Sequence, residues 1–366
     1  MHNIIKYENL NLVNQKFELE FNNKFKQFLN KGWYILGNEV NQFEKSFADY
    51  NGSKYCIGVA NGLDAIEIGL LVLGFPPKSE IIVPSNTYIA TILAIINAGH
   101  IPILVEPDIR TYNIDTTKII EKITFKTKAI LVVHLYGNMA QMDKLLEISS
   151  IYNLEIIEDC AQSHGAKFNN IKSGNFGKIG AFSFYPTKNL GALGDAGAIT
   201  TSDHDLYIKI KAIRNYGSQI KYHNKYIGRN SRLDEIQATF LNVKLPFLDQ
   251  INKHKSIIAD LYNSLLCEKV IKPVKIDNSL SVYHIYNIRC NKRDELKNYL
   301  LENNIESEIH YPISPSQQEA YKHIFENTNY PISEEIHNTT LSLPISYSTK
   351  IEEVYKIISV INTFFN

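Results

Sequence analysis

The first two-thirds of the chain alternates short aliphatic runs with segments whose apolar positions repeat every three or four residues. The short runs are apolar at consecutive positions, which is typical of strands buried on both faces of a parallel sheet. The longer segments are typical of helices that cover such a sheet. Strands are expected at residues 79–84, 101–105, 129–133 and 155–157, and helices at 88–99, 117–123 and 142–152. The pattern predicts an α/β fold with a three-layer, mainly parallel sheet.

The pattern of expected helices and strands changes after about residue 245. The expected elements from there are a long helical stretch at 234–266, a strand at 282–289, a helix at 293–302 and a strand-like segment at 307–311. The chain closes with an amphipathic helix, before which Thr349 and Glu352 have the spacing of a capping box. We therefore expect a large domain at 1–245 and a small C-terminal α+β domain at 246–366.

Composition mainly excludes classes of protein. The 366 residues include 38 Lys and Arg against 38 Asp and Glu, so no net charge attracts the chain to nucleic acid or an anionic membrane. Cys56, Cys160, Cys267 and Cys290 lack C-x-x-C spacing, which argues against a zinc site or a disulfide framework and fits a reducing cytosol. The N-terminal residues contain no apolar signal-peptide core, and no apolar run is long enough to span a bilayer. We expect a cytoplasmic protein without a bound metal.

The candidate chemistry lies where the expected strands end. Asp159 directly follows the strand at 155–157, and Lys188 lies in a stretch of aromatic, hydroxyl and glycine residues at 180–197. A carboxylate at a strand end and a lysine on a glycine-rich turn suit pyridoxal 5′-phosphate (PLP). The lysine forms a Schiff base with the aldehyde, and the carboxylate keeps the pyridine nitrogen protonated. Considered alone, the pair is equally well explained by a salt-bridged aspartate and a solvated loop lysine.

A phosphate site is expected at the helix that begins near Asn61. Asn61 is a good N-cap with Asp64 three residues on, and Gly62 lets the backbone approach a ligand closely. The hydroxyl of Ser183 can hold the same phosphate. The simpler alternative is an ordinary capped helix.

Three weaker features follow. The ring of Tyr88 could lie over a flat cofactor or pack in the core, and Gln162 could bind the ring hydroxyl or be solvated. The basic, aromatic loop at 221–232 could bind an anionic substrate through arginines, although most such loops are only solvated. The glycines at 191–197 lack the spacing of a dinucleotide fingerprint, and the sequence contains no GxxxxGK[ST], HExxH or GxSxG.

Taken in order, these motifs resemble the sugar-nucleotide aminotransferases of the DegT/StrS type, within fold type I of the PLP enzymes (the aspartate aminotransferase superfamily). The resemblance runs from about residue 32 to residue 344, nearly the whole chain. Its most specific parts are residues 157–162, 182–197 and 228–238.

The resemblance implies a role for each matching residue. Lys188 is the catalytic Schiff-base lysine, and the cofactor-binding residues are Gly62, Leu63, Tyr88, Asp159, Gln162, Ser183, Lys188 and Asn230, the last contributed by a neighbouring subunit. The substrate contacts are Tyr185, Arg229, His310 and Tyr311. Many members have a hydroxyl residue at the position of Leu63. Leucine cannot make a side-chain contact with the phosphate, but its backbone N–H still can. Some members are dehydratases with histidine in place of the lysine, and Lys188 argues against that branch.

The resemblance also implies an activity. Residues 61–66 are most similar to members that aminate C3 of a dTDP-linked 3-keto-6-deoxyhexose, which gives a dTDP-3-amino-3,6-dideoxyhexose for surface-glycan biosynthesis. L-Glutamate is the expected donor, Lys188 moves a proton in both half-reactions, and a homodimer shares its two active sites. The alternatives are a C4 aminotransferase acting on an NDP-4-keto-6-deoxyhexose, a non-catalytic PLP-binding regulatory protein and a cofactor-free binding module. The nucleotide and the configuration at C4 stay open.

Overall fold

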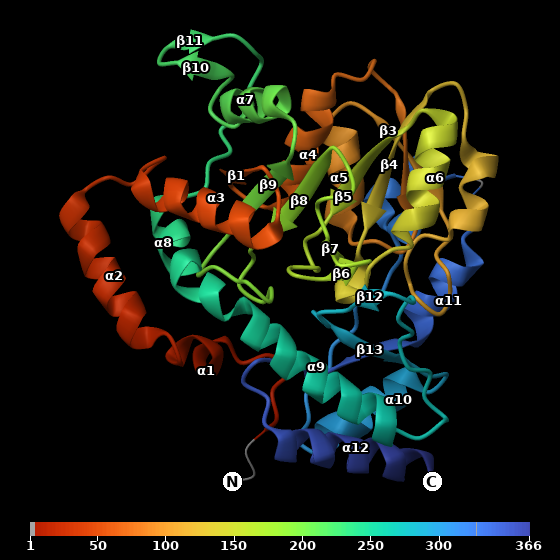
Figure 1. Cartoon of the computed structure of the whole chain (residues 1–366). Coiled ribbons are helices and arrows are strands. Elements are labelled where there is room, and N and C mark those ends of the chain that lie inside the picture. The colour runs from red at the N-terminus through yellow and green to blue at the C-terminus, as the bar shows by residue number, and fades with distance from the viewer. Residues whose placement is uncertain (1–3, 327) are drawn as a thin grey trace.

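Figure 1 shows the computed structural model, which describes residues 4–326 and 328–366. A seven-stranded sheet lies at the centre of the large domain, in the order β1-β9-β8-β5-β4-β2-β3. Its strands are β1 (Tyr55–Val59), β2 (Glu80–Pro84), β3 (Ile101–Val105), β4 (Thr127–Val133), β5 (Glu155–Asp159), β8 (Ile179–Ser183) and β9 (Gly197–Thr201). β9 pairs antiparallel with both of its neighbours, and the other pairings within the sheet are parallel. The predicted mainly parallel sheet is confirmed.

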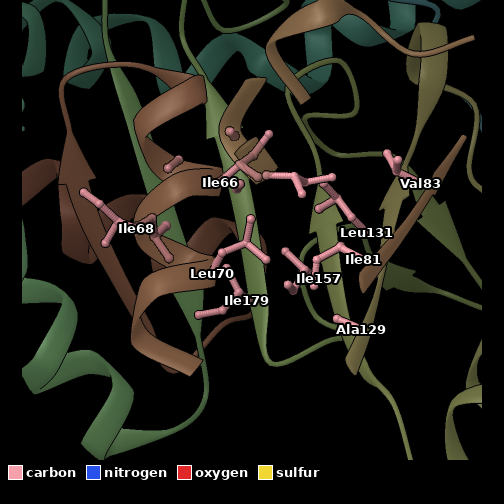
Figure 2. Close-up of a cluster of buried hydrophobic side chains, with 14 of the residues drawn as sticks. Ile66, Ile68, Leu70, Ile81, Val83, Ala129, Leu131, Ile157 and Ile179 are labelled. Atoms are coloured by element: carbon pink, nitrogen blue, oxygen red, sulfur yellow. The ribbon is translucent and has the colours of Figure 1, made fainter. Parts of the chain in front are cut away.

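Helices cover both faces of the sheet. One layer consists of α4 (Gly62–Leu73), α5 (Ile89–Asn97) and α7 (His204–Ile213), and the other of α3 (Asn38–Asn51), α6 (Met142–Tyr152) and α8 (Glu235–Lys244). Figure 2 shows the first interface, where Ile66 and Leu70 of α4 pack against Ile157 of β5 and Ile179 of β8. Burying each such side chain contributes ~1.5–3 kcal/mol relative to exposure. The three-layer arrangement follows from strands that are apolar on both faces.

The C-terminal third forms a smaller α+β unit. Its two strands, β13 (Tyr286–Arg289) and β14 (Thr340–Leu343), pair antiparallel, and α9 (Leu248–Leu265), α10 (Arg293–Glu302), α11 (Pro331–Thr339) and α12 (Ile351–Phe365) surround them. The core of this unit joins α9, α10 and α12 to the strand pair, and Ile5 from the start of the chain also packs in it. The domain boundary between residues 245 and 246 stays a prediction. Ile5, from the N-terminal side of that boundary, packs in the core of the C-terminal unit.

The remaining elements are short or peripheral. The chain begins with α1 (Leu10–Gln15) and α2 (Glu18–Lys31), the latter packed against α8. A small sheet has the order β12 (Ser279–Leu280), β6 (Lys167–Phe168) and β7 (Ile171–Lys172), and β10 (Ser218–Ile220) pairs with β11 (His223–Asn224). Within the described residues, no helix is both long and apolar enough to cross a bilayer.

Several predicted helices differ in detail. The helical stretch at 234–266 is two helices joined by a 3₁₀ turn at Leu245–Phe247, because Pro246 has no N–H to continue the helical ladder. The helix at 117–123 is instead two 3₁₀ turns, Thr116–Lys118 and Ile120–Lys122. The capping box lies one residue later than predicted, because the carboxylate of Glu353, and not that of Glu352, accepts from the N–H of Lys350 at 2.8 Å.

The strands differ as well. β1, β8 and β9 were not predicted, since β8 and β9 are rich in Gly, Ala, Ser and Thr and lack a long aliphatic run. The strand at 282–289 is regular only from Tyr286, and the segment at 307–311 forms a single bridge between Glu308 and Ser342. The strand-like segment expected at 307–311 is therefore reduced to one antiparallel bridge.

Candidate active site

A cavity of about 660 Å³ lies at the carboxyl ends of β2, β4, β5 and β8, which is where ligands bind in open α/β sheets. Its lining includes the start of α4, the β2–α5 connection, the loop after β8 and residues from the C-terminal unit. Of the residues predicted from sequence, the cavity brings together Gly62, Leu63, Tyr88, Asp159, Gln162, Ser183, Tyr185, Lys188, His310 and Tyr311. Arg229 and Asn230 do not line the cavity of the same chain.

Lys188 presents its amine inside this cavity. Its backbone N–H donates to the carbonyl of Tyr185 at 2.8 Å, which closes a turn just after β8. Burial lowers the pKa of Lys188 to about 8; the charge of Asp159 opposes this shift, and the charge of Lys255 adds to it. A lysine whose pKa is this low has an appreciable neutral fraction near neutral pH, which suits it for Schiff-base and proton-transfer chemistry.

Asp159 ends β5 and turns its carboxylate toward the cavity. Oδ2 accepts from the Thr91 hydroxyl at 2.8 Å, and Oδ1 accepts from the N–H of Ala161 at 3.1 Å. Burial raises the pKa of Asp159, while the two hydrogen bonds and the charge of Lys188 oppose that rise. A buried carboxylate that faces a cavity favours a cationic partner there, and a protonated pyridine nitrogen is such a partner. The residue therefore fits PLP.

The neighbouring Glu158 keeps this strand end in place. Its carboxylate accepts from the backbone N–H groups of Gly174, Phe176 and Gly177 at 2.7–2.8 Å. It also lies 3.0 Å from Nε2 of His134. Because these donors already occupy it, Glu158 supports the strand end, while Asp159 is the carboxylate that faces the ligand space.

The start of α4 and Ser183 form the opposite end of the cavity. Asn61 caps α4, because its side-chain oxygen accepts from the N–H of Asp64 at 2.8 Å. The N–H groups of Gly62 and Leu63 lie in the first turn, where an α-helix provides no acceptor, and the helix dipole favours an anion there. A Cβ at Gly62 would lie only 2.6 Å from Cβ of Ser183. These amides and the Ser183 hydroxyl are thus close enough to serve one phosphate.

Tyr88, Gln162 and Tyr311 meet on one wall of the cavity. Gln162 accepts from the N–H of Tyr136 at 2.6 Å and donates to the hydroxyl of Tyr311 at 3.0 Å. Tyr88 occupies the N-cap position of α5, and its half-exposed ring lies 5.1 Å from that of Tyr311, centroid to centroid. Tyr88 therefore presents a ring to a flat ligand in the cavity.

Thr87, Thr91 and His284 are among the polar residues of the lining that were not candidate site residues in the sequence. Thr91 donates to Asp159, and the hydroxyl of Thr87 lies 2.8 Å from that of Thr91. Nε2 of His284 lies 3.4 Å from Nζ of Lys188. Thr87 and Thr91 lie in an otherwise ordinary helix start, and His284 lay in a predicted strand, so no pattern distinguished them from structural residues.

Arg229 and Asn230 lie outside the cavity lining of their own chain. Nε of Arg229 donates to Glu67 of α4 at 2.7 Å, and Asn230 bridges to Asn215. The adjoining β10–β11 hairpin projects from the top of the molecule in Figure 1. Their contact with a cofactor across a subunit boundary stays a prediction.

Comparison with known proteins identifies the family to which the chain belongs. Residues 15–362 match the model of the DegT/DnrJ/EryC1/StrS aminotransferase family. The chain is 48% identical over 362 residues, 99% of each protein, to the dTDP-3-amino-3,6-dideoxy-alpha-D-galactopyranose transaminase of Aneurinibacillus thermoaerophilus.

Two solved structures extend the comparison. DesV of Streptomyces venezuelae, solved with a ketimine intermediate, superposes with a TM-score of 0.96 at 36% identity, covering 99% of this chain and 98% of DesV. NtdA of Bacillus subtilis, solved with bound PMP, superposes with a TM-score of 0.89 at 30% identity, covering 94% of this chain and 81% of NtdA. These neighbours have the fold-type-I architecture expected from the sequence. The chain belongs to the DegT/DnrJ/EryC1/StrS aminotransferase family and is a PLP-dependent aminotransferase.

Proposed function

We propose that this aminotransferase moves an amino group from L-glutamate to C3 of a dTDP-linked 3-keto-6-deoxyhexose, giving a dTDP-3-amino-3,6-dideoxyhexose. The observation that carries the chemistry is the single cavity that contains both the Lys188 amine and the buried Asp159 carboxylate. The choice of sugar rests on the full-length 48% identity with a relative named for a product of this type.

Different residues of the cavity bind the cofactor and transfer the proton. PLP, when bound, supplies an electrophilic aldehyde and an electron-accepting ring. Asp159 would hold the ring nitrogen protonated, the Gly62 and Leu63 amides with Ser183 would hold the phosphate, Tyr88 would cover the ring, and Gln162 would stand near the ring hydroxyl. The Lys188 amine takes a proton from the glutamate Cα and later returns one to the sugar carbon. One base serves both half-reactions because its attachment to the loop after β8 keeps it beside the proton that it transfers.

The sugar nucleotide would lie along the tyrosine and histidine side of the cavity. Tyr185, His310 and Tyr311 line it, and the Tyr185 side chain is half exposed. Nδ1 of His310 lies 2.9 Å from the hydroxyl of Ser342, and the His310 carbonyl accepts from Tyr136, so this segment is held in place. We propose that these three side chains position the sugar relative to the Lys188 amine.

The charge of the cavity supports a shared site in a homodimer. Lys188 is the only lysine or arginine among the described residues that line it, alongside three aspartates. The cofactor phosphate, the glutamate carboxylates and the nucleotide diphosphate are all anions, which lysine and arginine side chains bind through strong charge-assisted hydrogen bonds. The loop at 221–232 has four, Lys221, Lys225, Arg229 and Arg232, of which Arg229 is ion-paired with Glu67 of its own chain. We propose that this loop enters the cavity of a second copy, with Asn230 on the cofactor phosphate and Arg229 on the substrate.

The test supplies purified enzyme with L-glutamate and, in parallel, the 3-keto and 4-keto isomers of dTDP-6-deoxyhexose. We expect 2-oxoglutarate release and an amine at C3, located by NMR, with a strong preference for the 3-keto sugar. A shift of one ring carbon is comparable to the ~1 Å misplacements that cost about two orders of magnitude in rate.

The other outcomes separate the alternatives. An amine mainly at C4 would replace the proposed substrate with an NDP-4-keto-6-deoxyhexose and leave the transaminase chemistry intact. Cofactor binding without 2-oxoglutarate release from any keto sugar would instead favour a regulatory role. We further propose a cytoplasmic enzyme that supplies surface-glycan assembly; the free thiols of Cys56, Cys160, Cys267 and Cys290 fit a reducing compartment.

A further inference from the structure

His284 occupies a position in the cavity to which the proposed mechanism assigns no task. Its side chain is buried, and Nε2 lies 3.4 Å from Nζ of Lys188. Within residues 4–326 and 328–366, this is the hydrogen-bond partner that the structure gives the Lys188 amine. The separation is long for a hydrogen bond, as catalytic contacts often are before a ligand tightens the site.

The backbone around His284 is fixed on several sides. The N–H of Val282 donates to the carbonyl of Gly137 at 3.0 Å, and the side chain of Asn189, next to Lys188, donates to the carbonyl of Val282 at 2.9 Å. The buried ammonium of Lys255, on α9, donates to the His284 carbonyl at 3.1 Å. These contacts hold the backbone of this segment against the lysine loop, while Nδ1 of the His284 ring has no hydrogen-bond partner among the described residues.

The ring is suited to accept a hydrogen bond. Burial, together with the charge of Lys188, lowers the pKa of His284 well below its usual value, so the imidazole is neutral. The other titratable groups around the amine are Asp159 at the end of β5, His164 after it, Lys255 on α9 and His310. Asp159 already accepts from Thr91 and Ala161 and faces the ring-nitrogen position, so it is committed elsewhere.

We infer that His284 is a catalytic residue whose Nε2 accepts a hydrogen bond from the Lys188 ammonium whenever that lysine is not bonded to the cofactor. When the Lys188 amine takes up a proton from a substrate carbon, the new ammonium keeps the proton and donates through it to His284. The amine thus stays beside the cofactor until it returns the proton. The inference rests on PLP-dependent transamination and not on which sugar is aminated.

The test uses the full-length protein freed of cofactor, so that the Lys188 amine is available. Its rate of modification by an amine-selective reagent is followed against pH by peptide mass spectrometry. The wild-type midpoint is expected near the lowered pKa of Lys188, about 8. Loss of a hydrogen bond to a charged group destabilises the ammonium, so His284→Leu should lower this midpoint by about one pH unit.

Two conservative variants locate the interaction on one nitrogen. The amide of His284→Gln reaches the position of Nε2, and that variant should keep the wild-type midpoint. The amide of His284→Asn reaches only the position of Nδ1, and that variant should behave like His284→Leu. With cofactor restored, the Leu and Asn variants should lose kcat more than they change KM for glutamate, while the Gln variant recovers most of kcat.

Thermal unfolding and cofactor affinity of each variant serve as folding controls. An unchanged midpoint in His284→Leu overturns the inference, as does an upward shift. Equal shifts in the Leu and Gln variants would assign the effect to packing and also overturn it. None of these results depends on a sugar substrate, so failure of the proposed sugar specificity is distinguishable from failure of this role.

Discussion

Gly62 offers a sharp test of the phosphate end of the site. It is the first residue of α4, where alanine ordinarily favours a helix more than glycine does. A Cβ added there would nevertheless lie 2.6 Å from Cβ and 3.3 Å from Oγ of Ser183. Gly62→Ala should therefore push the start of α4 away from Ser183 without weakening the helix itself.

The size of the effect follows from that contact. Carbon atoms in contact prefer about 3.5–4.0 Å, so the two segments must separate by roughly 1 Å. A hydrogen bond of ~2.9 Å stretched by that amount is no longer one. Since a hydrogen bond to a charged group contributes ~1.5–3 kcal/mol, losing one should weaken PLP affinity roughly 10- to 100-fold.

The assay is absorbance titration of the cofactor-free protein with PLP, and Ser183→Gly provides the matched background. In that variant the nearest Ser183 atom to the added Cβ is the backbone Cα, at 3.2 Å, so most of the steric conflict disappears. Adding Gly62→Ala to Ser183→Gly should then cost less than about threefold, although the lost hydroxyl weakens both proteins. Equal penalties in the two backgrounds, or unchanged affinity in Gly62→Ala alone, would refute the reasoning.

Four further changes test other parts of the structure. Lys188→Ala should stay folded and bind PLP, but lose at least about 10³-fold in kcat and fail to retain the cofactor after borohydride reduction; sustained steady-state turnover would contradict its role. Asp159→Asn should keep the fold and lose at least about 10²-fold in kcat, because the ring nitrogen is no longer held protonated; near wild-type kcat would argue otherwise. Mixing Lys188→Ala with Asn230→Ala chains should restore activity at one of the two sites of the mixed dimer, and demonstrated exchange without recovery would count against a shared site. Glu235 accepts from three N–H groups at the start of α3 at 2.7–3.0 Å, so Glu235→Gln should lower the free energy of unfolding by about 1–3 kcal/mol, measured in urea; an unchanged midpoint would show that these bonds contribute little.

The sheet shows how far local pattern carries a fold prediction. β2, β3, β4 and β5 were predicted because each contains a run of aliphatic residues, which are buried on both faces except at the edge strand β3. β8 was not predicted because its sequence, Ile179-Gly-Ala-Phe-Ser, has small residues that suit close packing and lacks an aliphatic run. A Cβ at Gly180 would lie 2.5 Å from Cα of Gly174, so glycine is required there by a neighbour and not by the strand.

Some residues of the site could likewise be predicted from local sequence, and others could not. The shared cavity of Lys188 and Asp159 was predictable because the residue types suited to the proposed chemistry are visible in a few adjacent residues. Thr91 and His284 were not, since each acquires its role from a single contact with a residue 68 or 96 positions away. The lowered pKa of Lys188 likewise comes from burial, which no local pattern encodes.

The sequence by itself determined the α/β class, the parallel core strands, the family resemblance and the choice of the two residues proposed to carry the cofactor chemistry. These are properties of short segments, because hydrophobic periodicity and glycine-rich turns act over a few residues. Only the tertiary structure decided which polar groups meet at the carboxyl end of the sheet. Packing brought Thr91 to Asp159, brought His284 to Lys188 and left Arg229 against Glu67 outside the cavity. Such contacts depend on how distant segments cross in space, and that crossing is set by the packing of the whole core.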